Sequence, residues 1–219
     1  MSIALSLGNN LTTNGVFKPA AVNNTSVNNV TTFASVPAGG ALFLLSTQTA
    51  SSSASIEFTS GIDSTYDSYV FKFINMHPAD NDRRFVFNGS TDGGSNYNVT
   101  KTTTAFYALH NEAGSSTSLS YHAGLDLAQS TDFQSISNPV GNDNDQCACI
   151  KLTLFNPSST AYVKHFIITA NSNDEADSQV NHYFAGYFNS TSAINALKFQ
   201  TNSGNIDSGT IKMYGVKKS

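Results

Sequence analysis

The sequence predicts an all-β protein in which two antiparallel sheets pack as a sandwich, with a jelly roll as the expected architecture. Three observations lead to this fold class. From about residue 54, short segments rich in β-branched and aromatic residues recur between clusters of turn-forming residues. Several of these segments alternate apolar and polar residues with a period of two. No window shows the 3.6-residue period of an amphipathic helix.

Nine segments have the length and composition of strands. They are 55–59, 66–76, 83–89, 98–109, 147–155, 161–170, 180–188, 193–201 and 209–216. The connections between them, such as 90–95 and 156–159, are rich in Gly, Pro, Asn, Asp and Ser, which are the residues that favour tight turns. This arrangement predicts antiparallel strands joined by short loops.

The alternation within two of these segments indicates which face is buried. Tyr69, Phe71 and Phe73 fall on one face of the segment 66–76, with Lys72 on the other. In the segment 147–155, the even-numbered positions 148 to 154 are apolar, while the odd-numbered positions include Cys149 and Lys151. We expect one face of each strand to contact the core and the other to contact water.

The stretch from Asn111 to Asn144 interrupts the strand pattern. It contains no Lys or Arg and has several acidic residues, among them Asp126 and Asp132. Loops of this length in a compact domain are commonly functional or form contact surfaces. A short helical turn is possible over residues 125–133. We expect a ligand or interface surface that includes Tyr107, Tyr121, Asp126 and Asp132.

The N-terminal quarter differs from the rest in composition. Residues 1–55 contain a single charged residue, Lys18, and too little apolar surface for a core of their own. A loosely held tail and an extended arm packed on a neighbouring subunit are both compatible with this, and the low charge favours the arm. We therefore divide the chain into an anchoring arm, 1–53, and a β-sandwich body, 54–219. We expect the apolar side chains of the arm to be buried against the neighbouring subunit. They are Val16, Phe17, Val22, Val27, Val30, Phe33, Leu42, Phe43, Leu44 and Leu45.

Charge and hydropathy exclude several classes of partner. Charged residues make up 12% of the chain, and 11 Lys and Arg stand against 15 Asp and Glu without a basic cluster, so we expect no nucleic-acid partner. The longest apolar run, 41–45, is far shorter than a membrane span. The N-terminus lacks the basic start and apolar core of a secretory signal. Cys147 and Cys149 are spaced poorly for a disulfide, and we expect reduced thiols made in a cytosol.

No catalytic or metal motif is evident. The five histidines lack zinc spacing, and two acid-rich segments, which contain Asp143 with Asp145 and Asp174 with Asp177, are weak calcium candidates. Asp and Asn also favour turns for backbone reasons. A glycan-modifying enzyme with Asp143 and Asp145 as acid and base is an alternative, but we expect no enzymatic activity and no cofactor.

Three segments carry a resemblance to a known class of proteins. The runs 56–69 (IEFTSGIDSTYDSY), 85–97 (FVFNGSTDGGSNY) and 208–216 (SGTIKMYGV) resemble virion structural proteins of tailed bacteriophages, particularly marine cyanophages. The resemblance covers about residues 54 to 217. It implies a jelly-roll module at the particle surface, as in decoration and fibre proteins, and it supplies no catalytic residues.

This resemblance sets the functional expectation. We expect a non-enzymatic capsid decoration protein that is made in the bacterial cytoplasm, is held on the virion by its N-terminal arm and associates as a homotrimer. Its partners would be other virion proteins, either the major capsid protein or tail proteins. The alternative is a tail-fibre or tail-associated adhesin whose loops bind a host surface glycan.

Overall fold

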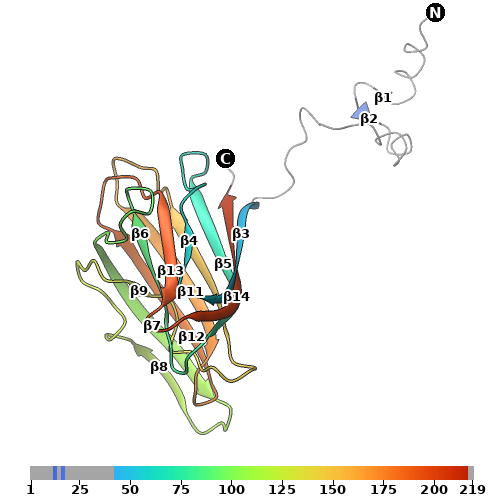
Figure 1. Ribbon diagram of the computed structural model, residues 1–219, viewed down its shortest axis with the longest axis vertical. Coiled ribbons are helices and arrows are strands. Elements are labelled where there is room, and N and C mark those ends of the chain that lie inside the picture. Colours follow the sequence, from blue (N-terminus) through green and yellow to red (C-terminus); the bar gives the residue numbers. More distant parts are fainter. Residues whose placement is uncertain (1–11, 14–15, 18–41, 217–219) are drawn as a thin grey trace, which may run out of the picture. The chain divides into compact units, whose positions relative to one another are not determined.

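A computed structural model describes residues 12–13, 16–17 and 42–216 of the chain. The chain divides into two units, residues 1–40 and 41–219. In the first unit, β1 (Thr12–Thr13) pairs antiparallel with β2 (Val16–Phe17). The second unit, which we call the body, contains the two larger sheets (Figure 1).

The body is built from strands alone in the part of the chain that the structure describes. Its strands are β3 (Leu42–Ser53), β4 (Ile56–Phe58), β5 (Ser68–Pro78), β6 (Phe85–Ser90), β7 (Lys101–Asn111), β8 (Thr117–Tyr121), β9 (Gln134–Ser135), β10 (Ala148–Phe155), β11 (Lys164–Asn173), β12 (Ser178–Phe188), β13 (Ala196–Thr201) and β14 (Ile206–Val216).

These strands form an eight-stranded sheet and a four-stranded sheet. The order in the large sheet is β3-β14-β5-β10-β11-β12-β7-β8, and the order in the small sheet is β4-β13-β6-β9. Every described pair of strands is antiparallel. In Figure 1, β3 and β14 lie at one side of the body, and β7 and β8 lie at the other. The predicted all-β, two-sheet sandwich is confirmed, while the jelly-roll connectivity stays a prediction.

Phenylalanine rings fill the space between the two sheets. Phe199 of β13 is in contact with Phe73 of β5, with ring centroids 4.9 Å apart, and with Phe71 of the same strand at 5.5 Å. Phe199 also contacts the rings of Phe58 and Phe87, which belong to its own sheet. All five rings are buried, and the edge-to-face contacts of Phe199 with Phe58 and Phe73 add to the apolar burial that holds the sheets together.

All nine strand segments expected from the sequence are strands in the structure, with ends that shift by a few residues. The predicted alternation is confirmed as well. Tyr69, Phe71 and Phe73 are buried beside a half-exposed Lys72, and β10 alternates buried and solvent-accessible residues along its whole length. Two short strands of the body, β8 and β9, were not expected, because both lie in the stretch 111–144, for which the sequence predicts a long loop.

The expected boundary between arm and body needs correction. Residues 42–53, assigned to the arm on composition, form the 12-residue strand β3, which pairs with β14 from Leu42↔Val216 to Ser53↔Ile206. The body therefore begins near Ala41 rather than at residue 54. The boundary was placed too late because residues 42–53 have the same low charge as the segment before them. Their partner strand, β14, lies at the other end of the sequence.

The helical turn considered for residues 125–133 is not formed. These residues make turns and bends, and their backbone pairs with β7. The Lys101 amide donates to the Ser130 carbonyl and the Ser130 amide donates to the Lys101 carbonyl, at 2.9 and 3.0 Å. Because β7 takes up these backbone groups, they are not available for a helical turn.

Candidate binding surface

The large sheet has one face against the core and one face directed away from it, which we call the outer face. Most of the exposed large apolar side chains of the described body lie on this face. They are Leu42, Leu44, Ile74, Phe106, Leu119, Tyr121, Phe155, Ile167 and Tyr183. Grouped apolar exposure of this kind marks interaction surfaces more often than ordinary solvent-facing surface.

One row of residues crosses the outer face from edge to edge of the sheet. Each residue in this row is directly opposite the next one on the neighbouring strand. We call these residues the cross-strand row. Its members, from β3 to β8, are Thr47, Lys212, Lys72, Lys151, Thr169, Tyr183, Phe106 and Tyr121.

Three adjacent positions of the cross-strand row are lysines. Lys72 pairs with Lys151 on one side and with Lys212 on the other, and neighbouring strands lie about 4.8 Å apart. None of the three ammonium groups forms an ion pair with a carboxylate of the described residues. Lys72 lies over the ring of Tyr214, with its ammonium 5.4 Å from the ring centroid. Like charges directly opposite each other destabilise a sheet, so this arrangement is not explained by stability.

Aromatic rings occupy the other end of the cross-strand row. The rings of Phe106 and Tyr183 are stacked, with centroids 4.9 Å apart and planes within 9° of each other. Tyr121 follows on β8, and its hydroxyl donates to Asp126 Oδ2 at 2.5 Å. The three rings keep between 40% and 54% of their surface exposed.

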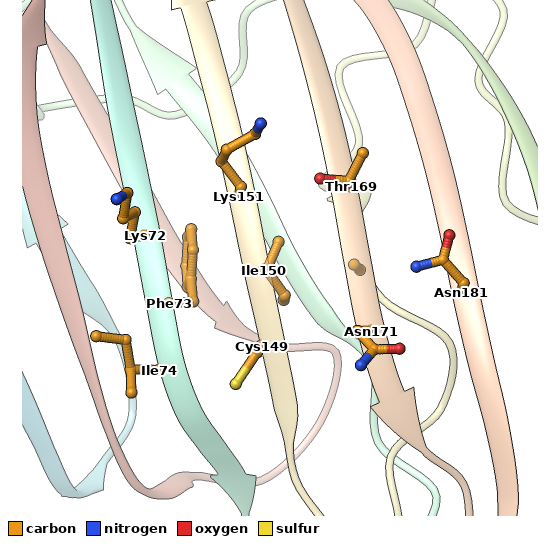
Figure 2. A pocket seen from close by; sticks show the side chains of 10 residues that line it. Lys72, Phe73, Ile74, Cys149, Ile150, Lys151, Thr169, Asn171 and Asn181 are labelled. Atoms are coloured by element: carbon orange, nitrogen blue, oxygen red, sulfur yellow. The ribbon is translucent and has the colours of Figure 1, made fainter. Parts of the chain in front are cut away.

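A shallow depression of about 320 Å³ lies on β5, β10, β11 and β12, and its lining includes Lys72, Lys151 and Thr169 of the cross-strand row (Figure 2). Thr169 lies between Lys151 and the strand that carries Asn181, and Asn171 is the next outward residue on its own strand. These polar side chains are shorter than Lys72 and Lys151, so the surface is lower here than at the lysines. The arrangement can accept a ligand that offers anionic groups to one end and hydrogen-bonding groups to the middle.

Of the predicted ligand or interface residues, the structure brings two together on the outer face. Tyr121 belongs to the cross-strand row and Asp126 accepts its hydrogen bond. Tyr107 points to the other side of β7, where its ring is stacked on His182, and the Asp132 carbonyl accepts a hydrogen bond from the buried Lys101 ammonium at 2.5 Å. The lysines of the row were missed by sequence reasoning, because they lie far apart in the chain.

Two histidines, the buried His182 and the half-buried His122, form a pair behind the aromatic end of the row. His122 Nδ1 lies 3.1 Å from His182 Nε2, and Tyr107 packs against both rings. Burial, with a smaller contribution from His122, lowers the pKa of His182 to about 4. Burial and the nearby Arg84 also lower the pKa of His122. Both rings are therefore neutral at pH 7.

Two lysines are buried, each at the first residue of a strand of the large sheet, Lys101 in β7 and Lys164 in β11. The Lys101 ammonium donates to the carbonyls of Val99 and Asp132, and the Lys164 ammonium donates to the carbonyl of Ser190. Burial lowers the pKa of Lys101 to about 8 and lowers the pKa of Lys164 as well. These two ammonium groups hold loop carbonyls in place and do not reach the outer face.

The weak calcium candidates lie in two loops, and hydrogen bonds of Gln146 link one loop to the other. Its amide nitrogen donates to the Asp174 carbonyl and to Asp177 Oδ1, both at 3.1 Å. Asp174 Oδ1 accepts from the amides of Ala176 and Ser178, as a turn-forming aspartate does. Within the described ranges, no group of three or more His, Cys, Asp or Glu side chains is placed to hold a metal ion. Asp143 and Asp145, the other candidates, lie in the loop before β10.

The two cysteines are both free thiols. Cys149 is exposed on the outer face, and Cys147 is half-buried just before β10. Burial raises the pKa of the Cys147 thiol, and Cys149 adds to the effect. The arm residues Val22, Val27, Val30 and Phe33 lie outside the described residues. Val16 and Phe17 form β2, and Leu42, Phe43, Leu44 and Leu45 lie in β3.

Comparisons of the chain with protein-family models, with curated proteins and with solved structures found no match. In the part of the chain that the structure describes, no helix has the length and hydrophobicity to cross a membrane.

Proposed function

We propose that this protein is a non-enzymatic structural component of a bacteriophage virion, most specifically a capsid decoration protein. In this proposal the low-charge segment before β3 anchors the β-sandwich body to a neighbouring subunit. The body is then displayed at the particle surface. The resemblance of the body sequence to phage virion proteins supports this assignment.

The open edge of β3 is the observation that carries the proposal. β3 is the first strand of the body, and it is the last strand of the large sheet on its side. Along 12 residues it pairs with β14 on one side only, among the described residues. A long unpaired edge is a ready template for a strand from another chain. Leu42 and Leu44 are exposed beside it and add apolar surface to such a contact.

Copy number tests the location. Quantitative peptide mass spectrometry of purified virions would compare this protein with the major capsid protein. We expect a ratio near one or near a simple fraction of one, as a lattice position requires. A ratio typical of a tail component would contradict decoration.

A truncation tests the anchor separately. Deletion of residues 1–40 removes the low-charge segment and leaves β3 in place. We expect the truncated body to remain folded but to be lost from particles. Particles that retain the truncated protein at full occupancy would contradict anchoring by the arm. Light scattering of the full-length protein would test the proposed homotrimer.

The second candidate is a tail-associated adhesin that binds a host surface glycan. The outer face favours it, because exposed aromatic rings and unpaired lysines lie in one row across the large sheet. A decoration role by itself does not require such a row.

A further inference from the structure

We propose that the outer face of the large sheet binds an acidic polysaccharide along the cross-strand row. Lys72, Lys151 and Lys212 would contact the anionic groups, and Tyr183 would stack against a sugar ring. This inference specifies the ligand class for the glycan-binding candidate above and rests on that candidate. It does not depend on how the protein is anchored.

The lysines indicate the charge of the ligand. Three of the chain's 11 basic residues occupy adjacent positions of one row, although the net charge of the chain is −4. The row and the two rows beside it, which include Leu44 and Ile167 on one side and Asn171 and Leu119 on the other, contain no Asp or Glu. Carboxylate, sulfate or phosphate groups bound between these ammonium groups would remove their mutual repulsion.

The ring of Tyr183 indicates that the anionic groups are carried by a sugar. Phe106 covers one face of this ring, and the next position of the row on the other side is the short Thr169. The second face of the ring is therefore open on the side of Thr169, beyond which Lys151 is the next member of the row. A pyranose ring has an apolar C–H face that packs on an aromatic face, and hydroxyl groups at its rim that suit Asn171 and Asn181 in the depression.

The lysines of the cross-strand row also argue against a dimer in which the outer faces of two copies pack on each other. Two outer faces packed on each other about a twofold axis would bring two lysine rows into one dry interface, which is costly without counter-charges. An acidic peptide would satisfy the lysines but has no ring for Tyr183. A repeating polymer of rings and anionic groups matches both ends of the row.

Calorimetric titration of the full-length protein tests the proposal. The probes are dextran sulfate, polygalacturonate and neutral dextran, with inorganic polyphosphate and polyglutamate as anionic polymers without sugar rings. We expect both acidic polysaccharides to bind and neutral dextran not to bind. Binding should weaken as NaCl is raised, because salt screens the lysines. No binding to either acidic polysaccharide, or equal binding to neutral dextran, would overturn the proposal.

Substitutions identify the face. Lys151→Thr should weaken binding about tenfold, as expected for one charge-assisted contact, and the triple variant with Lys72→Thr and Lys212→Thr should abolish it. Thr suits a strand, and circular dichroism would confirm that the variants are folded. Lys198→Thr makes the same charge change on the small sheet and should leave binding unchanged. Full binding by the triple variant would rule out this face.

A variant of the ring separates a glycan from other anionic polymers. Tyr183→Leu keeps an apolar side chain and removes the flat ring. We expect it to weaken binding of the acidic polysaccharides several-fold. If Tyr183→Leu binds as tightly as wild type, and polyphosphate or polyglutamate binds as tightly as dextran sulfate, the ligand is not a glycan and the proposal fails.

Discussion

His122 Nδ1 and His182 Nε2 lie 3.1 Å apart in the body, and His182 Nδ1 has no hydrogen-bond partner among the described residues. One imidazole must donate and the other accept, so at least the accepting ring is neutral at this nitrogen. Protonation of both rings would place two positive charges side by side, with Arg84 nearby. The pair therefore links the stability of the fold to pH.

We predict that the stability of the body falls as the pH is lowered from about 6.5 to about 4. Burial lowers the pKa of His182 to about 4 in the folded protein from its ordinary value of 6.5. In this window the unfolded chain binds more protons than the folded one, so stability is lost as the pH falls. Melting temperatures of the wild type and of His182→Gln at several pH values measure the effect. The variant should show a shallower decline between pH 6.5 and 4, and identical slopes would contradict the prediction.

The three lysines of the cross-strand row should lower the free energy of unfolding when no ligand is bound. Replacing Lys151 by Thr removes a like charge opposite Lys72, and we expect the free energy of unfolding to rise by about 0.5 kcal/mol. The matched change Lys198→Thr removes an ion pair with Glu57, whose nitrogen and oxygen lie 3.1 Å apart, and should lower stability slightly. Denaturant titrations at low salt measure both. A loss of stability in Lys151→Thr would show that the lysine has a structural role.

The corrected arm boundary makes a prediction about truncation. Removing residues 1–40 should leave the melting temperature of the body within about 2 °C of the full-length value, since a change below 1 kcal/mol corresponds to a shift of that size. Removing residues 1–53 deletes β3, leaves one edge of β14 unpaired and should lower the melting temperature and promote aggregation. Equal melting temperatures for the two truncated proteins would place the boundary at residue 54 after all.

Gly209 lies at an irregularity in the pairing of β14 with β5, and its φ is +127°. A Cβ at this position would lie 2.8 Å from Met76 Cα and 2.9 Å from the Asn75 carbonyl oxygen. We predict that Gly209→Ala lowers the free energy of unfolding by about 3 kcal/mol, through backbone strain and this clash together. Gly93 also has a positive φ, +74°, but a Cβ there meets nothing within 4 Å, so Gly93→Ala should cost only about 1 kcal/mol. Thermal denaturation of the two variants compares them, and a smaller loss at Gly209 would contradict the assignment.

The fold class and the positions of most strands followed from the amino-acid sequence alone. Alternation within one strand is a local property, so Tyr69, Phe71 and Phe73 indicated a core face without knowledge of any partner strand. Two of the strands that were missed, β8 and β9, lie in the stretch 111–144, for which the sequence predicts a long loop. β3 was missed because its composition resembles the segment before it.

The set of residues that meet on the outer face depends on how the strands are assembled. Lys72, Lys151 and Lys212 come from three strands whose order in the sheet does not follow their order in the chain. A one-residue change of register in β10 would move Lys151 to the core face and leave no row. Register depends on long-range backbone pairing, which residue spacing within one strand does not encode, so the candidate binding surface became visible only once the strands were assembled.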